Sequence, residues 1–221
     1  MISYAFPDKC YYCGKFVLDK KVNICDNCLK TLPLIKGKKC AICGREEFSC
    51  FCKIGDFAFA ANYSFMRYSG PCADIVKRFK FSGLPQLSEF MGNELGCYLK
   101  NECKDIKFDF VTFVPMHPID EFRRKYNQSR LLAIRVAKHL DLKVVDCLSK
   151  RFSFKHQKSL NREERHKQIK GKFIAKKDLS NKTVLLIDDV FTTGATLNEC
   201  AKVMKKAGAE TVYTATFAIS Y

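Results

Sequence analysis

The stretch Val184-Leu-Leu-Ile-Asp-Asp-Val-Phe-Thr-Thr-Gly-Ala-Thr196 decides the fold of this chain, because it joins an apolar run, two carboxylates and a hydroxyl-rich turn. Residues 184–187 are a short apolar run, which predicts a strand covered on both faces. Residues 197–207 have helical spacing and propensity, so residues 192–196 must turn the chain between strand and helix. A strand followed directly by a helix is typical of an α/β fold with a parallel sheet.

This turn favours a bound phosphate group. The first N–H groups of a helix lack partners within the helix, and the helix dipole is positive at that end. Gly194 allows the backbone to approach a ligand closely, and the Thr hydroxyls can donate hydrogen bonds. The predicted phosphate-binding loop consists of Thr192, Thr193, Gly194, Ala195 and Thr196.

Asp188 and Asp189 stand at the carboxyl end of the predicted strand, which is where open α/β sheets bind their ligands. Ionised carboxylates at that position accept hydrogen bonds from vicinal hydroxyls, and they can hold Mg²⁺ directly or through water. Together with the turn, they predict a site for a phosphorylated sugar. The alternative is a buried strand whose carboxylates only cap the following helix.

The segment resembles the phosphoribosyl pyrophosphate (PRPP) motif of type I phosphoribosyltransferases. That resemblance implies the type I phosphoribosyltransferase fold, which is a mostly parallel sheet flanked by helices. It also implies that Asp188 and Asp189 are catalytic residues that bind the ribose hydroxyls, that the Thr-rich loop holds the 5′-phosphate, and that Mg²⁺ accompanies PRPP.

Length and charge restrict the class of protein. A chain of 221 residues with 47% hydrophobic residues can bury one substantial core and a small appendage. Its apolar runs are far shorter than the roughly 18 residues that span a bilayer, and residues 1–8 lack the apolar stretch of a signal peptide. We therefore expect a soluble, cytoplasmic protein without integral membrane association.

The formal net charge of +16 points to a polyanionic partner such as nucleic acid or phosphates, with an anionic membrane surface as the weaker alternative. Residues 150–177 contain eleven Lys or Arg and two Glu, so this one segment carries over half of the excess positive charge.

The cysteines predict a metal-binding module. Eight of the thirteen fall in spaced pairs before residue 53, which favours metal ligands in a reduced compartment over disulfides. Four thiolates suit tetrahedral Zn²⁺, so the pairs predict one structural zinc ion and a less certain second one. The first set is Cys10, Cys13, Cys25 and Cys28, and the second is Cys40, Cys43, Cys50 and Cys52. Alternatives are an interleaved pairing of the first and third pairs, and a redox-active pair.

The remaining cysteines and the apolar pattern describe a second domain. Cys72, Cys97, Cys103, Cys147 and Cys200 are expected to be small buried residues. We assign residues 1–56 to the zinc module and residues 57–221 to the phosphoribosyltransferase-like domain. Strands are predicted at residues 57–65, 110–114, 143–148, 183–187 and 211–218, and helices at 72–79, 87–100, 129–140 and 197–207.

A second motif follows the strand predicted at residues 110–114. It reads Val114-Pro-Met-His-Pro118 and, a few residues later, Arg123-Arg-Lys-Tyr-Asn-Gln128. In a transferase this turn would receive pyrophosphate, with charge from the arginines and directed hydrogen bonds from the amides. The candidate ligands here are Arg123, Arg124, Asn127 and Gln128, and the alternative is an ordinary solvated face.

These motifs together narrow the resemblance to the ComF family, whose members pair an N-terminal zinc module with this domain and take part in DNA uptake during natural competence. The stretches Gln157-Lys-Ser-Leu160-Asn-Arg162-Glu-Glu-Arg165 and Gly171-Lys-Phe173 also match, so the likeness covers almost the whole chain.

The resemblance assigns further residues. Gln157, Arg162 and Arg165 correspond to the mobile loop that closes over the site in related transferases, and Lys80 matches a basic position of the family. Lys125 departs from the family pattern, which usually has Gly there. Because Gly often marks a positive φ or a close ligand approach, this departure bears directly on pyrophosphate binding.

The favoured function is the handling or uptake of single-stranded DNA by a PRPP-binding phosphoribosyltransferase fold, with a helicase-like competence protein as a further partner. Aromatic residues beside basic ones suit stacking on single-stranded DNA; they are Tyr11, Tyr12, Phe51, Phe152 and Phe154. The alternatives are an active phosphoribosyltransferase with an unknown acceptor and a PRPP-sensing regulator. The acidic pair is compatible with both catalysis and sensing.

Overall fold

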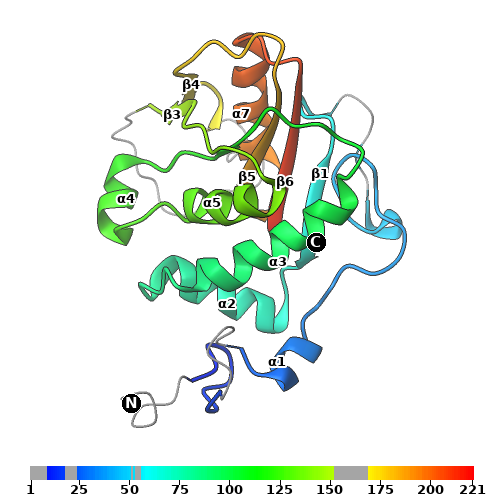
Figure 1. Cartoon of the computed structure of the whole chain (residues 1–221), viewed down its shortest axis with the longest axis vertical. Coiled ribbons are helices and arrows are strands. Elements are labelled where there is room, and N and C mark those ends of the chain that lie inside the picture. The colour runs from blue at the N-terminus through cyan, green and yellow to red at the C-terminus, as the bar shows by residue number, and fades with distance from the viewer. Residues whose placement is uncertain (1–8, 18–23, 51, 53–55, 152–168) are drawn as a thin grey trace.

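A four-stranded parallel sheet forms the centre of the structure, a computed structural model that describes residues 9–17, 24–50, 52, 56–151 and 169–221 (Figure 1). The strands lie in the order β1-β6-β5-β2, and every neighbouring pair is parallel. Their bounds are β1 (Asn62–Arg67), β2 (Phe110–Phe113), β5 (Thr183–Phe191) and β6 (Thr211–Ile219). The predicted α/β fold with a parallel sheet is therefore confirmed.

The apolar run in β5 is continuous because this strand is buried on both faces. Leu185 and Ile187 belong to the core on one side of the sheet. Val184 and Leu186 belong to a second core on the other side. All four side chains are fully buried, as expected for an inner strand of a parallel sheet that has helices on both sides.

Helices cover both faces of the sheet. On one side are α2 (Gly70–Phe81), α3 (Leu87–Glu102) and α5 (Gln128–Leu140). On the other side is α7 (Ala195–Lys206), together with the antiparallel pair β3 (Leu148–Lys150) and β4 (Phe173–Ala175). A short helix, α4 (Pro118–Arg124), follows β2.

Small residues allow α3 and α5 to approach closely. A Cβ atom at Gly92 would lie 2.5 Å from Cβ of Arg135, and one at Gly96 would lie 2.7 Å from Cδ2 of His139. Any larger side chain at either position would push the two helices apart. This packing fixes the position of α5, whose amino-terminal end lines the pocket described below.

Several predicted elements were wrong in their bounds or pairing. Residues 57–61 precede β1 instead of belonging to it. In the predicted strand 143–148, only Val144 pairs with β2, through a bridge to Val111, and the regular strand β3 starts at Leu148 and pairs antiparallel with β4. Cys97 is exposed, whereas the other four single cysteines are buried.

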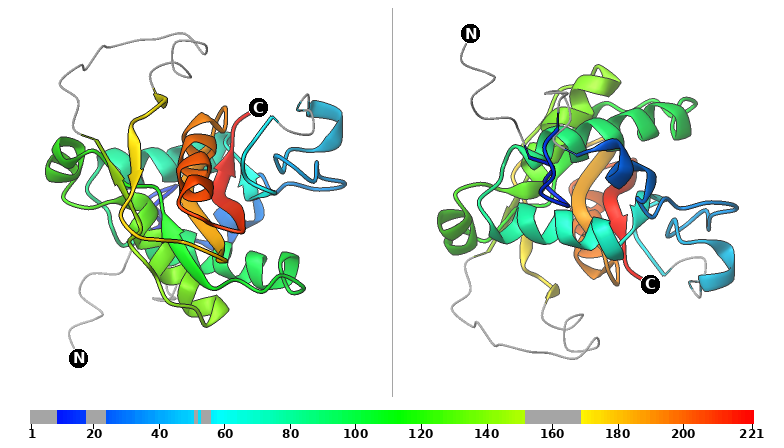
Figure 2. Two further views of the ribbon diagram at one scale, coloured as in Figure 1. Left: turned by 90° about the horizontal axis from the view of Figure 1, so that it is seen from above. Right: turned by 90° about the horizontal axis from the view of Figure 1, so that it is seen from below.

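The cysteine-rich segment packs against the domain in two places. Cys10 and Ile24, which precede the short helix α1 (Asp26–Lys30), and Cys28 within this helix share a hydrophobic core with Ile75 and Phe79 of α2. The later part, around the 3₁₀ helix Glu47–Ser49, lies beyond β1 and on the opposite side of the molecule from α4 (Figure 2). Each part of the cysteine-rich segment therefore rests on a different edge of the domain.

Within the described ranges, no helix is both long and apolar enough to cross a lipid bilayer.

Candidate functional site

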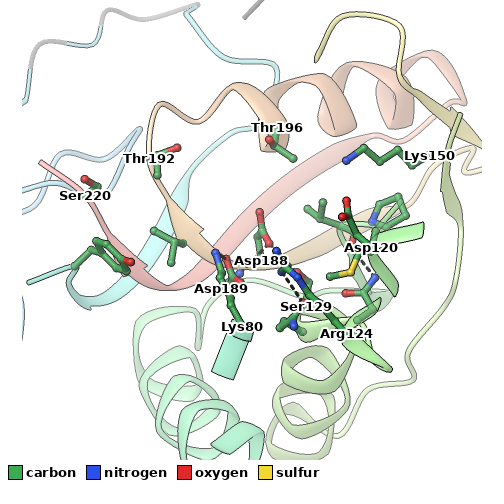
Figure 3. A pocket seen from close by; sticks show the side chains of 17 residues that line it. Lys80, Asp120, Arg124, Ser129, Lys150, Asp188, Asp189, Thr192, Thr196 and Ser220 are labelled. Atoms are coloured by element: carbon green, nitrogen blue, oxygen red, sulfur yellow. Dashed lines mark hydrogen bonds and ion pairs between the residues drawn. The ribbon is translucent and has the colours of Figure 1, made fainter. Parts of the chain in front are cut away.

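A pocket of about 390 Å³ lies where the four parallel strands end. Its wall includes residues from the ends of β5 and the segments that directly follow β1, β2 and β6, which is the usual ligand position in open α/β sheets. It is lined by Tyr68, Lys80, Val114, Pro115, Met116, Asp120, Arg124, Asn127, Gln128, Ser129, Lys150, Asp188, Asp189, Val190, Thr192, Thr196 and Ser220 (Figure 3).

The acidic pair occupies the floor of this pocket and is held by three hydrogen bonds or ion pairs. Ser129 Oγ donates to Asp188 Oδ1 at 2.7 Å, and the backbone N–H of Asp189 donates to the same oxygen at 2.9 Å. Lys80 Nζ lies 2.8 Å from Asp189 Oδ1. Lys80 reaches the pair from the last turn of α2, whereas Ser129 comes from the first turn of α5 (Figure 3). The acidic pair therefore joins the two helices to β5.

Ionisation of Asp188 is disfavoured in this pocket. Burial and the neighbouring charge of Asp189 raise the pKa of Asp188 to about 6, although the hydrogen bond from Ser129 and the charge of Lys80 act in the opposite direction. A carboxylate in this state gains from any added positive charge, such as a divalent cation. A cation beside Asp188 would therefore favour the ionised form of this carboxyl group.

The turn after β5 leads directly into the first turn of a helix. Gly194 has φ of 75°, and a Cβ atom there would lie 2.5 Å from Cζ of Phe191 and 2.9 Å from Cε1 of Phe57. Only glycine fits this position. Helix α7 begins directly afterwards, two residues earlier than predicted, and its N-cap residue Gly194 supplies no side-chain cap. The amino-terminal turn of α7 therefore has no cap from its N-cap side chain, which suits an anion, although the N–H of Ala195 already donates to Thr193 Oγ1.

Thr192 and Thr196 of this turn line the pocket above the acidic pair (Figure 3). The Thr193 hydroxyl instead accepts a hydrogen bond from the backbone N–H of Ala195 at 3.3 Å. The five residues of the predicted phosphate loop thus divide into two that face the pocket and three that shape the turn.

The second motif contributes to the opposite wall of the pocket. Arg124, Asn127 and Gln128 line it, whereas Arg123 is turned away and pairs with Asp120 at 3.3 Å. Arg124 Nη1 donates to Gln128 Oε1 at 3.3 Å. Within the described part of the chain, Arg124 Nε and Gln128 Nε2 are buried and have no hydrogen-bond partner. Buried donors without a partner are costly, so these two favour a bound acceptor.

Lys125 adopts a left-handed conformation with φ of 66°, at the C-terminal cap of α4. This agrees with the expectation that the position needs a positive φ, which Gly adopts without strain and Lys adopts at a cost. The Lys125 side chain lies with Arg123 and Phe122 outside the main pocket. The Lys125 side chain therefore does not block the main pocket.

The structure adds pocket residues that the sequence did not single out as ligands. Lys150, the first residue of the basic segment, lines the pocket, and burial lowers the pKa of its amine. Ser129 and Asp120 also lie there, and no local motif marked them. The predicted loop residues Gln157, Arg162 and Arg165 lie outside the described residues, as do Phe51, Phe152 and Phe154.

The eight paired cysteines form two separate clusters in the order of the sequence. Within each cluster all four Sγ atoms lie within 4.8 Å of one another, and all thirteen cysteines are free thiols. The first cluster is Cys10, Cys13, Cys25 and Cys28, and the second is Cys40, Cys43, Cys50 and Cys52. The interleaved pairing considered above is therefore wrong.

Both clusters have the donor set of a closed structural zinc site, which is four thiolates. Burial disfavours the thiolate of Cys10, but backbone N–H groups of Cys13, Cys25 and Tyr12 outweigh it and lower the pKa to about 6. Backbone N–H groups of Cys43 and Ile42 likewise outweigh burial at Cys40 and lower its pKa to about 7. Each cluster thus contains a thiol that ionises readily, as a metal ligand must.

Comparisons with known proteins match two parts of the chain to different families. Residues 1–74 match the double zinc ribbon domain family, and residues 127–219 match the phosphoribosyl transferase domain family. The second match includes both the acidic pair and the turn that follows it. The fold and the clusters therefore define a phosphoribosyltransferase-type domain that carries an N-terminal double zinc ribbon.

Full-length relatives identify the family. The chain is 30% identical to competence protein ComFC of Streptococcus pneumoniae, over 86% of this chain and 85% of the relative. It is 25% identical to competence protein F of Haemophilus influenzae, over 94% and 95%. It is 24% identical to the DNA utilization protein YhgH of Escherichia coli, over 66% of each chain. The chain belongs to the ComF family of competence proteins.

The two clusters predict two zinc equivalents per chain. We expect the double variant Cys40→Ser/Cys43→Ser to lose one equivalent and keep the other, because no cysteine is shared between the clusters. Elemental analysis of the purified proteins measures this directly. The matched control is Cys97→Ser, an exposed cysteine outside both clusters, which should keep two equivalents. A single equivalent in the unaltered protein would contradict the assignment.

The acidic pair should lower the stability of the ligand-free protein. Because the folded pKa of Asp188 is about 6 and the ordinary value is 3.8, the folded state binds a proton that the unfolded state releases. Stability therefore falls as the pH rises from 3.8 toward 6, and the loss is complete above that range. Asp188→Asn removes the charge and keeps the acceptor oxygen. We expect it to stabilise the protein by about 1–3 kcal/mol at pH 8.

Thermal unfolding without ligand at pH 8 and pH 5.5 tests this, and the gain should shrink at the lower pH. The control is Asp109→Asn, which removes the same charge. The pKa of Asp109 is lowered by the N–H of Thr183 and by Lys182, so this variant should be less stable. A destabilised Asp188→Asn protein at pH 8 would contradict the raised pKa assigned to Asp188.

Proposed function

We propose that the pocket binds PRPP together with Mg²⁺. The observation that carries this proposal is the junction of a positive helix end and an acidic pair in one pocket at the strand ends. The turn of residues 192–196 would hold the 5′-phosphate, because its helix N–H groups and hydroxyls are hydrogen-bond donors. Asp188 and Asp189 would accept hydrogen bonds from the two ribose hydroxyls.

The pyrophosphate of the ligand fits the other wall of the pocket. Arg124 and Lys150 supply positive charge there, and Gln128 supplies an amide donor. Arg124 Nε and Gln128 Nε2 lack partners within the described residues, so the pyrophosphate oxygens would satisfy them. We leave Arg123 out of the ligand set, because its guanidinium pairs with Asp120 and it lies with Phe122 and Lys125 outside the main pocket.

A divalent cation fits beside the acidic pair. The carboxylates of Asp188 and Asp189 would hold Mg²⁺ directly or through water, and the cation would neutralise part of the ligand's charge. Lys80 now occupies one oxygen of Asp189, at 2.8 Å. Lys80 thus acts as the internal counterion, and ligand with Mg²⁺ would compete with it for Asp189.

We further propose that the protein acts in the handling or uptake of single-stranded DNA. The names of the relatives support this role, since two are competence proteins and a third is a DNA utilization protein. The net charge of +16 supplies the attraction to a polyanion. The basic segment begins at Lys150, which lines the pocket, so we propose that DNA binds close to the phosphoribosyl ligand.

Turnover of PRPP and a helicase-like partner remain predictions of the family resemblance. The proposal for the pocket concerns binding, which both a catalytic and a sensing role require. Ligand binding and DNA binding can therefore be tested separately.

PRPP with Mg²⁺ should protect the protein against thermal unfolding. At about 100 times its dissociation constant a ligand adds roughly 2.7 kcal/mol, which corresponds to about 5–10 °C for a chain of this size. The double variant Asp188→Asn/Asp189→Asn should lose this protection, because uncharged amides bind a divalent cation and accept hydrogen bonds from the ribose hydroxyls more weakly than carboxylates do. Asp109→Asn should keep the protection, because Asp109 directly precedes β2 and lies at the other end of the strands from the pocket. Equal protection of the double variant would refute the assignment of the pocket.

DNA binding should depend steeply on salt. Neutralising Arg151, Lys155 and Lys158 to Gln should lower the slope of log affinity against log salt concentration by about 2, at roughly 0.7 per phosphate contact. Titration of a labelled oligodeoxythymidine at several salt concentrations measures the slope. The matched control neutralises the same number of exposed lysines at the end of α3 and the loop after it, Lys100, Lys104 and Lys107. Equal slopes for both triple variants would remove the basic segment from the DNA interface.

A further inference from the structure

The knuckle of the second zinc cluster touches the phosphate-binding turn through one residue, Arg45. Arg45 follows Cys43 by two positions, and its Nη2 donates to the backbone carbonyl of Thr192 at 2.7 Å. The same guanidinium donates to the backbone carbonyl of Ser220 through Nε at 3.2 Å and Nη2 at 2.9 Å. Thr192 is the first residue of the turn, and Ser220 directly follows β6. Arg45 therefore ties together the ends of two neighbouring strands at the edge of the pocket.

The Arg45 guanidinium also contacts an aromatic ring. It lies 5.4 Å from the centre of the Phe191 ring, and Phe191 is the side chain that contacts Gly194. A cation over an aromatic face is favourable. Arg45 thus contacts both the backbone and the packing core of the turn that surrounds the proposed 5′-phosphate.

The zinc knuckle itself is fixed firmly to the sheet. The backbone N–H of Asn62 donates to the carbonyl of Ile42 at 2.8 Å, and Asn62 Nδ2 donates to the carbonyl of Cys43 at 3.0 Å. A Cβ atom at Gly44 would lie 2.4 Å from the Asn62 carbonyl oxygen. The backbone N–H of Cys40 also donates to the Arg45 carbonyl at 2.7 Å. The backbone of residues 40–45, which carries Cys40 and Cys43 of the second cluster, therefore sets the position from which the Arg45 side chain reaches the turn.

Glu46 adds a second connection between the same knuckle and the ends of β1 and β6. Its buried carboxylate accepts hydrogen bonds from Arg67 of β1 and from the Tyr221 hydroxyl, the latter at 2.8 Å. The hydrogen bond from Arg67 lowers the pKa of Glu46, so this carboxylate is charged at neutral pH. Two consecutive residues of the knuckle thus hold three of the four strand ends.

We propose that Arg45 is a positioning residue for the ligand pocket: by holding the Thr192 carbonyl, it makes the order of the second zinc cluster a determinant of PRPP affinity. This inference rests on the proposed PRPP site. It assigns to the second zinc ribbon a role beyond stabilising its own fold. It also predicts that disturbing a cysteine ligand and removing Arg45 weaken ligand binding through the same contact.

The test compares dissociation constants of PRPP with Mg²⁺, measured by calorimetry, for the unaltered protein, Arg45→Gln and Arg45→Lys. We expect Arg45→Gln to weaken binding by about 5- to 50-fold, the usual range for coupled sites. Arg45→Lys keeps the charge but lacks the planar fork that donates from both Nε and Nη2, so it should also lose affinity. The matched control is Lys38→Gln on the same ribbon, which removes an exposed charge paired with Glu47 at 3.0 Å. Its affinity should not change.

Three outcomes would overturn the inference while leaving the pocket assignment intact. Arg45→Gln could bind as tightly as the unaltered protein. Arg45→Lys could do so while Arg45→Gln and Lys38→Gln weaken alike, which would reduce the effect to charge. The double variant Arg45→Gln/Cys50→Ser could show additive losses, whereas a shared contact requires less than additive ones. No binding of PRPP by the unaltered protein would instead refute the proposed function.

Amide hydrogen exchange supplies a readout that is independent of ligand. In ligand-free Arg45→Gln, the backbone amides of residues 192–196 should exchange faster, and those of α3 should exchange as before. Zinc content checks that the variant keeps both metal sites. Unchanged exchange in the turn of a folded, zinc-replete variant would contradict the positioning role.

Discussion

The rest of the site depends on one constraint, which is the placement of two adjacent carboxylates in the second half of a strand buried on both faces. Asp188 and Asp189 lie in a strand whose preceding four residues are fully buried, so water can solvate them only from the pocket. Their mutual repulsion and burial raise the pKa of Asp188 to about 6. Ser129 of α5 donates a hydrogen bond to Asp188, and Lys80 of α2 forms an ion pair with Asp189. These two partners join α5 and α2 to the pocket.

This arrangement explains why the pocket has charges of both signs. The acidic floor requires a cation, while the helix end at residue 195 and the side chains of Arg124 and Lys150 require an anion. A ligand that carries phosphate groups and binds a divalent cation satisfies both requirements at once. PRPP with Mg²⁺ has this composition, which is why we propose it as the ligand in place of a simple sugar phosphate.

Local patterns allowed the centre of the fold to be predicted from the sequence. The apolar run of β5, the acidic pair and the turn at Gly194 are adjacent in the chain, and each has a short-range physical cause. The failures occurred where pairing is decided at long range. Val144 and Val145 look like strand residues, but only Val144 pairs with β2, because the chain then leaves the sheet to form β3 with β4.

The same distinction applies to the site. Spacing alone marked both sets of four cysteines, and the basic run marked Arg124, but no pattern near Arg45 reveals that it reaches Thr192 and Ser220, 147 and 175 positions away. Ser129 was hidden for the same reason, since its partner Asp188 is 59 positions away. Contacts between the zinc ribbon and the pocket can be read only from the folded chain. They connect the second zinc ribbon to the ends of β5 and β6.

The most direct test of the account is a crystal structure of the protein with PRPP and Mg²⁺. The account predicts that the 5′-phosphate lies against the turn of residues 192–196 and that the ribose hydroxyls bond Asp188 and Asp189. A pocket that stays empty at saturating ligand, or a ligand bound away from the acidic pair, would contradict it.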